Sequence, residues 1–179
     1  MVKPTFRLFF ALWPEATCRI ELAAAQCVLQ ANIPARWIKP ENLHMTLAFL
    51  GDVEVKARDG LTTVAKKIQS QNFELLFDRI EHWRKPQVIC HTPTANSTIL
   101  EQLVADLTYE LREAGYSLEK RPYRAHLTLA RRAAYLPAEA RLENPILWKS
   151  TDFVLAASTR DALGSTYTVL ESWPLGDSF

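Results

Sequence analysis

The sequence predicts an α+β fold with a mostly antiparallel sheet. Segments with strand character outnumber helical ones, and several follow one another as hairpin-like pairs, which is typical of α+β proteins. In addition, one short pattern, His-x-Thr-Leu-Ala, occurs twice, beginning at His44 and at His126. Polar and apolar residues alternate in both copies with the strand period of two, so we expect each copy to be a half-buried strand.

Composition narrows the class of protein. The 179 residues, 48% of them hydrophobic, predict one globular domain spanning 1–179. The formal net charge is only +1, so any affinity for RNA must come from local patches. Three cysteines without a Cys-x-x-Cys pair argue against a disulfide framework and a zinc site. We find neither a signal-peptide pattern nor an apolar run of about 20 residues, and we expect a cytoplasmic monomer that does not engage a membrane.

The first half of the chain begins with a buried strand at residues 6–12, followed by a helix from Pro14 to about residue 30. Its expected buried residues are Ile20, Ala23, Ala24, Cys27 and Val28. In the first motif strand, at residues 42–51, strict alternation places Phe49 on the face opposite to His44 and Thr46. Asp52 is the expected N-cap of a second helix, whose apolar stripe is Leu61, Val64, Ala65 and Ile68.

The second half is predicted to begin with strands at 73–83, with an irregularity, and at 88–91. Thr98 and Glu101 fit a capping box for a third helix that ends at Gly115. Its stripe is Leu100, Leu103, Val104, Leu107 and Leu111. We expect a short strand near 116–118, the second motif strand at 125–131, an irregular connection over 133–148, and strands at 150–157 and 167–173 joined by a turn at 161–165.

The two motifs and their surroundings resemble the 2H phosphoesterases, specifically the bacterial RNA 2′,3′-cyclic phosphodiesterases once called 2′–5′ RNA ligases. The resemblance covers nearly the whole chain, and two copies with these flanks are a specific signal. It rests on Arg7 to Leu12, Arg36-Trp37, Asn42 to Gly51, Arg121 to Arg131 and Tyr167 to Leu175. It implies two pseudo-symmetric lobes, each a sheet backed by helices, with one His-x-Thr strand from each lobe facing the cleft between them.

The residue types suit the opening of a cyclic phosphate. The reaction needs a base for water, an acid for the departing sugar oxygen, and donors for the phosphate oxygens. Histidine serves both proton roles because its ordinary pKa is about 6.5. Two histidines on two facing strands can lie on opposite sides of phosphorus, and the hydroxyls of Thr46 and Thr128 share their faces and can bind the phosphate oxygens.

The resemblance assigns the individual roles. It implies that His44 protonates the 3′-oxygen, that His126 activates water, and that the product carries a 2′-phosphate. It also places Arg131 in the site, although strict alternation would turn this side chain away unless the strand ends or bulges after Ala130. Phe10 is the expected stacking partner of the terminal base, with core packing as its alternative. We expect no metal and no cofactor, because two histidines are too few ligands for a typical zinc site.

Other notable side chains have ordinary explanations. The basic run Lys120, Arg121 and Arg124 either guides an RNA backbone or forms a solvated face. We interpret His82 and His91 as structural or surface residues, and Cys90 as a core residue. The tryptophans Trp37, Trp83, Trp148 and Trp173 are expected to pack rather than stack on substrate.

Three functions compete. The leading one is hydrolysis of a 2′,3′-cyclic phosphate at the end of an RNA, such as a tRNA fragment, or of a small cyclic phosphate. The second is joining of tRNA halves by a 2′–5′ bond, which the same histidines could catalyse with a 5′-hydroxyl in place of water. The third is a non-catalytic module that binds RNA ends. A bell-shaped pH–rate profile would separate the enzymes from the binding module.

Overall fold

Two antiparallel sheets and three α-helices make up the fold in the computed structural model, which describes residues 5–161 and 164–176. The α+β class predicted from the sequence is confirmed. The elements in chain order are β1 (Thr5–Leu12), α1 (Ala16–Gln30), β2 (Arg36–Trp37), the 3₁₀ turn η1 (Pro40–Asn42), β3 (Met45–Glu54), the 3₁₀ turn η2 (Val55–Ala57), α2 (Arg58–Lys67), β4 (Phe73–Trp83), β5 (Val88–Pro93), α3 (Thr98–Glu113), β6 (Leu127–Arg131), β7 (Ile146–Ser150), β8 (Asp152–Asp161) and β9 (Gly164–Pro174).

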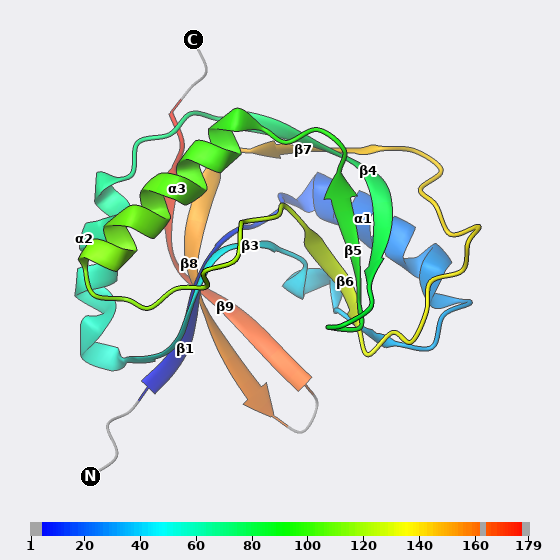
Figure 1. Ribbon diagram of the computed structural model, residues 1–179, viewed down its shortest axis with the longest axis horizontal. Helices are drawn as coiled ribbons and strands as arrows, with labels where there is room; N and C mark the ends of the chain where they lie inside the picture. Colours follow the sequence, from blue (N-terminus) through cyan, green and yellow to red (C-terminus); the bar gives the residue numbers. More distant parts are fainter. Residues whose placement is uncertain (1–4, 162–163, 177–179) are drawn as a thin grey trace.

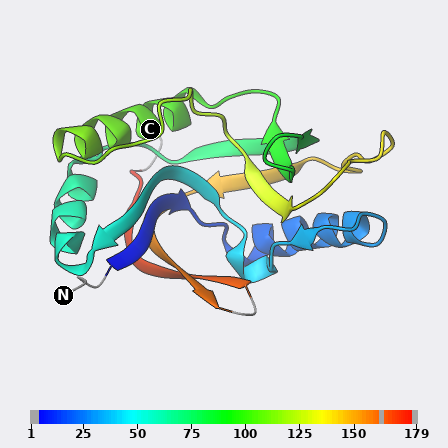
Figure 2. The ribbon, with the colours of Figure 1, turned by 60° about the horizontal axis from the view of Figure 1, so that its bottom comes forward.

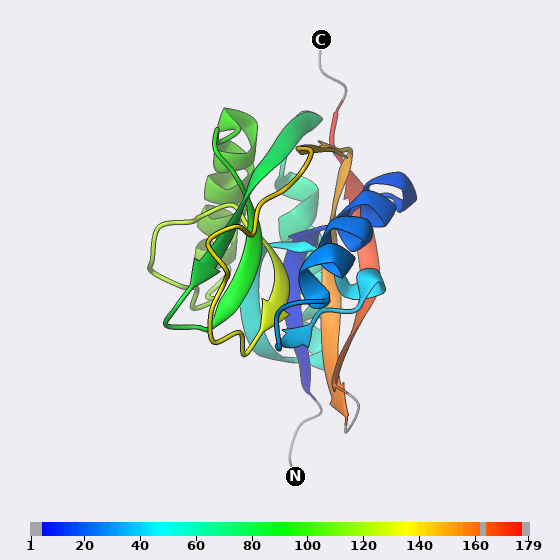
Figure 3. The same cartoon turned by 90° about the vertical axis from the view of Figure 1, so that its right-hand side faces the viewer.

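Each sheet carries one of the two motif strands. The four-stranded sheet has the order β3-β1-β8-β9, and the five-stranded sheet has the order β2-β6-β5-β4-β7. The strands of the two sheets lie on opposite sides of the molecule in Figure 3, with β5 and β6 in green to yellow and β1, β8 and β9 in blue, orange and red. The pseudo-symmetric, two-sheet arrangement implied by the resemblance is therefore present.

The three helices are divided between the two sheets. α2 and α3 lie together beside the four-stranded sheet, while α1 lies at the other end of the molecule beside the five-stranded sheet (Figures 1 and 2). Their apolar stripes join both sheets in one large cluster of buried side chains. None of the helices in the described ranges is long and apolar enough to span a membrane.

The predicted buried face of α1 is wrong. Ile20 is 70% exposed and Val28 63% exposed, and Cys27 is also exposed. The helix instead buries Cys18, Leu22, Gln26 and Leu29. Apolar residues surround this helix on several sides, so the pattern alone does not select one face. A polar residue, Gln26, lies at the centre of the true face because its amide group has buried partners, described below.

Several element boundaries differ from the predicted ones. Asp52 lies inside β3 and does not cap α2, which begins at Arg58. Ser97, not Thr98, caps α3, and its hydroxyl accepts a hydrogen bond from Leu100 N at 3.3 Å. The stripe of α3 and the left-handed Gly115 (φ +89°) at its end are confirmed.

The segments around the second motif differ as well. Residues 116–118 form no strand, and strand β7 begins within the connection that was expected to be irregular. β8 and β9 pair along their whole length, from Asp152 opposite Pro174 at one end to Asp161 opposite Gly164 at the other. The expected hairpin is therefore confirmed, while residues 162 and 163 of its predicted turn lie outside the described residues.

Candidate active site

Each motif histidine immediately precedes its strand and is held by the same local bond. His44 Nδ1 lies 2.6 Å from the carbonyl oxygen of Asn42, and His126 Nδ1 lies 2.7 Å from that of Arg124. In both cases the acceptor is the residue two positions earlier. A carbonyl can only accept, so Nδ1 carries the proton and donates. Each ring therefore keeps Nε2 available for proton transfer to or from a substrate.

Asn42 is itself fixed by the four-stranded sheet. Its buried amide donates to Ser165 O at 2.9 Å and accepts from Tyr167 N at 3.3 Å. Both partners belong to β9, whereas the main-chain oxygen of Asn42 holds His44. The position of His44 thus depends on a strand more than 120 residues later in the chain.

Aromatic rings contact both imidazoles. The ring of His44 stacks on Trp13 with centroids 5.2 Å apart and meets Phe9 at 5.0 Å and Tyr167 at 4.9 Å. The ring of His126 lies 4.5 Å from that of Trp83. Trp148 and Trp173 pack in the core, as the sequence predicted. Trp83 also packs within the protein, and one of its neighbours is a motif histidine.

Trp83 is held by a polar network. Its indole N–H donates to Glu81 Oε2 at 2.9 Å, and Arg124 donates to the same oxygen at 2.5 Å. The Arg124 guanidinium also lies 4.9 Å from the centre of the Trp83 ring. Glu81 therefore holds both the ring beside His126 and the residue whose carbonyl accepts the His126 hydrogen bond.

Both motif strands contain a β-bulge at the leucine of the motif. In β3, Thr46 pairs with Ala11 and Ala48 with Phe10, so Leu47 is an extra residue. In β6, Thr128 pairs with Cys90 and Ala130 with Ile89, so Leu129 is extra. A bulge reverses the alternation of side chains beyond it. It therefore brings the residue three positions after each threonine back to the face that carries the threonine.

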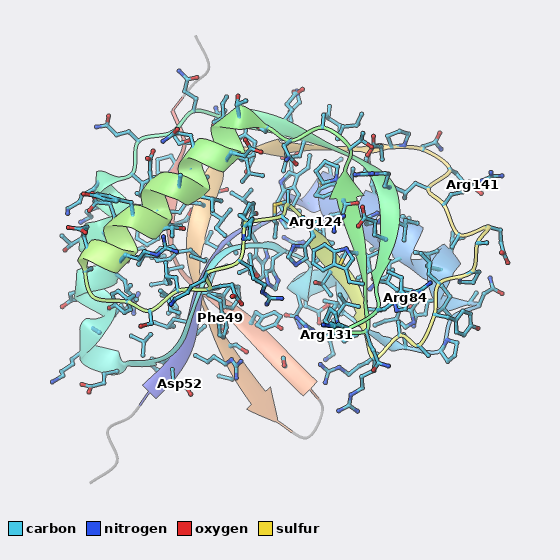
Figure 4. All side chains as sticks on the ribbon, in the orientation of Figure 1. Phe49, Asp52, Arg84, Arg124, Arg131 and Arg141 are labelled. Atoms are coloured by element: carbon cyan, nitrogen blue, oxygen red, sulfur yellow. The ribbon has the colours of Figure 1, made fainter. Side chains whose placement is uncertain are left out.

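The bulges correct one expectation and fulfil the condition for another. Phe49, expected on the face opposite to His44, lies on the same face as Thr46 and is 44% exposed. Arg131, for which the sequence required a bulge, reaches the face of Thr128 because of the bulge at Leu129. Phe49 and Arg131 thus occupy equivalent positions in the two motifs (Figure 4).

Phe10 does not reach this face. Its side chain has no exposed surface and packs between Phe153 and Trp173, with ring centroids 6.2 and 5.9 Å away. A fully buried ring cannot stack on a base, so the core-packing alternative is correct. The neighbouring Phe9, one position earlier on the opposite face of β1, is the ring that contacts His44. The alternation of β1 carried this signal, but which face was turned to the site was not visible in the sequence.

Arg131 contributes to the pKa of both motif histidines. The pKa of His44 is lowered to about 4, mainly by burial and to a smaller extent by the charges of Arg131 and His126, against the opposing effect of the hydrogen bond to Asn42. Burial also lowers the pKa of His126, with smaller contributions from Arg131 and Arg124. The Arg131 guanidinium therefore acts on both imidazoles. A bound phosphate anion would oppose these shifts, because a nearby negative charge favours the imidazolium.

The remaining site residues also lie where the two sheets meet. Thr46 and Thr128 are both half-buried, and the Thr128 hydroxyl lies 4.0 Å from Cys90 Sγ. The hydroxyl of Tyr123 donates to Thr46 O at 3.3 Å and so links the segment before β6 to β3. Two surface cavities, of about 450 and 610 Å³, lie elsewhere and contain none of these residues. Within the described ranges, no three His, Cys, Asp or Glu side chains gather as a metal site would require.

Comparison with known proteins finds relatives in sequence and in fold. The sequence profile of the family described as LigT like Phosphoesterase matches residues 12–90. The RNA 2′,3′-cyclic phosphodiesterase of Escherichia coli strain K12 is 28% identical over 169 residues, which cover 94% of this chain and 96% of the relative. The crystal structure of E. coli LigT complexed with 3′-AMP superimposes with a TM-score of 0.89 at 28% identity, covering 96% of this chain and 99% of that one. The chain is therefore similar in sequence and in fold to the LigT-like phosphoesterases.

A further relative of this chain is the RNA 2′,3′-cyclic phosphodiesterase of Bacillus subtilis strain 168. It is 36% identical over 104 residues, which cover 54% of this chain and 55% of the relative. Crystal structures of E. coli LigT with phosphate and with ATP also align over nearly the whole chain, with TM-scores of 0.80 and 0.86 at 26% identity. The family profile ends at residue 90, before the second motif, whereas the similarity to E. coli LigT extends over nearly the whole chain.

Proposed function

We propose that the protein hydrolyses the 2′,3′-cyclic phosphate at the end of an RNA to a 2′-phosphate, with His44 as general acid and His126 as general base. The observation that carries this proposal is the duplicated geometry. Two imidazoles from two sheets each have Nδ1 bound to a carbonyl and Nε2 available, and Arg131 acts on both. The names of the relatives support the same substrate class.

The reaction uses these groups without a bound metal. His126 Nε2 takes a proton from water as the water oxygen forms its bond to phosphorus. The bond between phosphorus and the 3′-oxygen then breaks, and His44 Nε2–H gives its proton to that oxygen. The hydroxyls of Thr46 and Thr128 donate to the non-bridging oxygens, and the Arg131 guanidinium stabilises the negative charge that develops on them.

Phe49 replaces Phe10 as the aromatic residue that contacts the nucleotide. Its ring lies on the face of Thr46 and is exposed, and the Arg7 guanidinium covers it at 4.9 Å from the ring centre. An exposed aromatic ring beside a guanidinium is a common platform for an unpaired base. The base of the terminal nucleotide would then lie against the four-stranded sheet, while Arg131 on the other sheet holds its phosphate.

Incubation of a short RNA ending in a 2′,3′-cyclic phosphate, with EDTA present, tests the proposal. The wild-type protein should release an RNA with a 2′-phosphate, identified by chromatography against 2′- and 3′-phosphate standards. His44→Ala and His126→Ala should each lower kcat by about 10²–10⁴-fold, the usual contribution of a general acid or base. Circular dichroism would establish that both variants are folded. A 3′-phosphate product would reverse the assigned leaving oxygen, and full activity of either variant would contradict the mechanism.

A further inference from the structure

One end of the five-stranded sheet gathers five cationic side chains from three segments of the chain. Arg36 of β2 pairs directly with Arg131 of β6, and Arg131 also pairs with Val88 at the start of β5. Residues 84–87 connect β4 to β5 at this same end, and Arg132 follows β6 (Figure 4). We call this group the basic end. It consists of Arg36, Arg84, Lys85, Arg131 and Arg132, of which all but the half-buried Arg36 are exposed.

The charges of the basic end are not neutralised within the described part of the chain. None of the five side chains makes an ion pair there. In the basic run Lys120, Arg121 and Arg124, which the sequence suggested as a guide for RNA, two of the three cations are ion-paired. Arg121 pairs with Glu119 at 2.8 Å, and Arg124 pairs with Glu81 at 2.5 Å. In a chain with a net charge of only +1, the basic end therefore gathers several cations whose charges no ion pair in the described ranges offsets.

The backbone of the basic end is strained and fixed. Gln87 (φ +52°) and Arg132 (φ +57°) are the only residues other than glycine with positive φ in the described ranges. They are adjacent in space, because Ala133 N donates to Gln87 O at 3.0 Å. His82 Nε2 lies 2.9 Å from Ala133 O and donates to it, since a carbonyl accepts. Strained conformations of this kind cost free energy and cluster at functional sites.

We propose that the basic end binds the backbone phosphates of the RNA nucleotides that precede the cyclic phosphate. This inference rests on the proposed function and narrows its substrate to an RNA chain, as opposed to a small cyclic phosphate. A cyclic phosphate ends its chain, so every other phosphate of the RNA lies on the 5′ side. Arg131 contacts the terminal phosphate, and Arg36, Arg132, Arg84 and Lys85 continue from it along the sheet end.

The double variant Arg84→Gln/Lys85→Gln tests the inference, because both residues are exposed in the turn between β4 and β5 and the proposed mechanism uses neither of them. We would measure kcat/KM for an RNA of about ten nucleotides with a 2′,3′-cyclic phosphate and for a mononucleotide 2′,3′-cyclic phosphate, from about 50 to about 200 mM salt. For a single-stranded RNA, the loss of two phosphate contacts should make the plot of log kcat/KM against log salt concentration less steep by about 1.4. Over this range the wild-type kcat/KM for the RNA should fall about sevenfold more than that of the variant. The mononucleotide should be hydrolysed equally by both proteins.

Arg58→Gln/Lys66→Gln on α2 is the matched control, because it removes two exposed charges that make no ion pair in the described ranges, at the other end of the molecule (Figure 1). It should retain the wild-type salt slope. An unchanged slope in the Arg84/Lys85 variant, or equal losses on RNA and mononucleotide, would overturn the basic end as an RNA site. Absence of turnover of both substrates by the wild-type protein would instead contradict the proposed function.

Discussion

The two motif histidines differ from free histidine because the protein withdraws them from water. Burial opposes the charged form, and the guanidinium of Arg131 opposes it again. In the free enzyme both imidazoles therefore favour the neutral form at neutral pH. In the proposed mechanism, binding of the negatively charged phosphate raises the pKa of His44, so the substrate itself would assist in protonating the proposed general acid.

This electrostatic coupling predicts an acid-shifted pH profile. Activity requires His44 to be protonated, so kcat/KM falls as pH rises through its pKa of about 4 in the free enzyme. It also requires His126 to be neutral, so kcat/KM falls as pH drops through the lowered pKa of His126. The maximum of kcat/KM should thus lie below the ordinary histidine pKa of about 6.5. The maximum of kcat should lie at higher pH, because the bound phosphate raises both pKa values.

Steady-state rates at saturating and at limiting mononucleotide 2′,3′-cyclic phosphate measure the two profiles separately. The mononucleotide has no preceding phosphates, so the other four cations of the basic end do not contribute. A kcat/KM maximum above pH 7 would contradict the electrostatic account. Coincident maxima for kcat and kcat/KM would contradict the effect assigned to the bound phosphate.

Among the structural elements, α1 controls the geometry of the second motif strand. Its buried Gln26 donates to Ile38 O at 2.7 Å and to Leu129 O at 2.9 Å. Leu129 is the extra residue of the bulge that turns Arg131 toward the site. A side chain on the helix thereby satisfies the backbone at the point where β6 departs from regular pairing.

Replacing Gln26 should therefore affect stability and activity together. Gln26→Ala leaves the buried carbonyl of Ile38 without this donor and removes one of two donors to Leu129 O. We expect the free energy of unfolding to fall by about 1–3 kcal/mol, measured by urea denaturation. KM for the mononucleotide should rise, because Arg131 loses its fixed position. Gln30→Ala, an exposed glutamine at the end of the same helix, should change stability by less than about 0.5 kcal/mol. Equal effects of the two variants would show that the bulge does not depend on Gln26.

For the folded chain taken together, two buried histidines link stability to pH. His44 and the fully buried His91 both have their pKa lowered to about 4, mainly by burial. The unfolded chain, with ordinary pKa values near 6.5, therefore binds more protons between pH 6.5 and 4. The stability that these neutral rings contribute is fully present above pH 6.5 and is lost as pH falls through this window.

His91→Leu should reduce this pH dependence. Each histidine contributes a slope of at most about 1.4 kcal/mol of unfolding free energy per pH unit. Urea denaturation at intervals from pH 7 to about 4.5 should show a shallower decline in the variant by up to that amount. The change in slope is the readout, so a uniform offset from altered core packing does not affect it. An identical slope in both proteins would mean that His91 is already protonated or exposed in the folded state.

The sequence was sufficient to predict most elements and to name the candidate residues of the site. The two His-x-Thr patterns named both histidines and both threonines, because period-two alternation and residue chemistry are local properties. The stripe of α3 and the irregularity in β4 were also predicted, and the structure confirms both. The role of Arg131 could be stated only on the condition of a bulge.

Features that depend on two distant segments required the folded structure. A bulge is defined only against its partner strand, so the sequence of β3 could not show that Phe49 turns to the site. The buried face of α1 follows from carbonyls of residues 38 and 129. Likewise, Arg124 is neutralised by Glu81, 43 residues earlier, whereas the cations of the basic end come from three separate segments. Local patterns specify what a side chain can do, but pairing between distant strands decides which side chains meet.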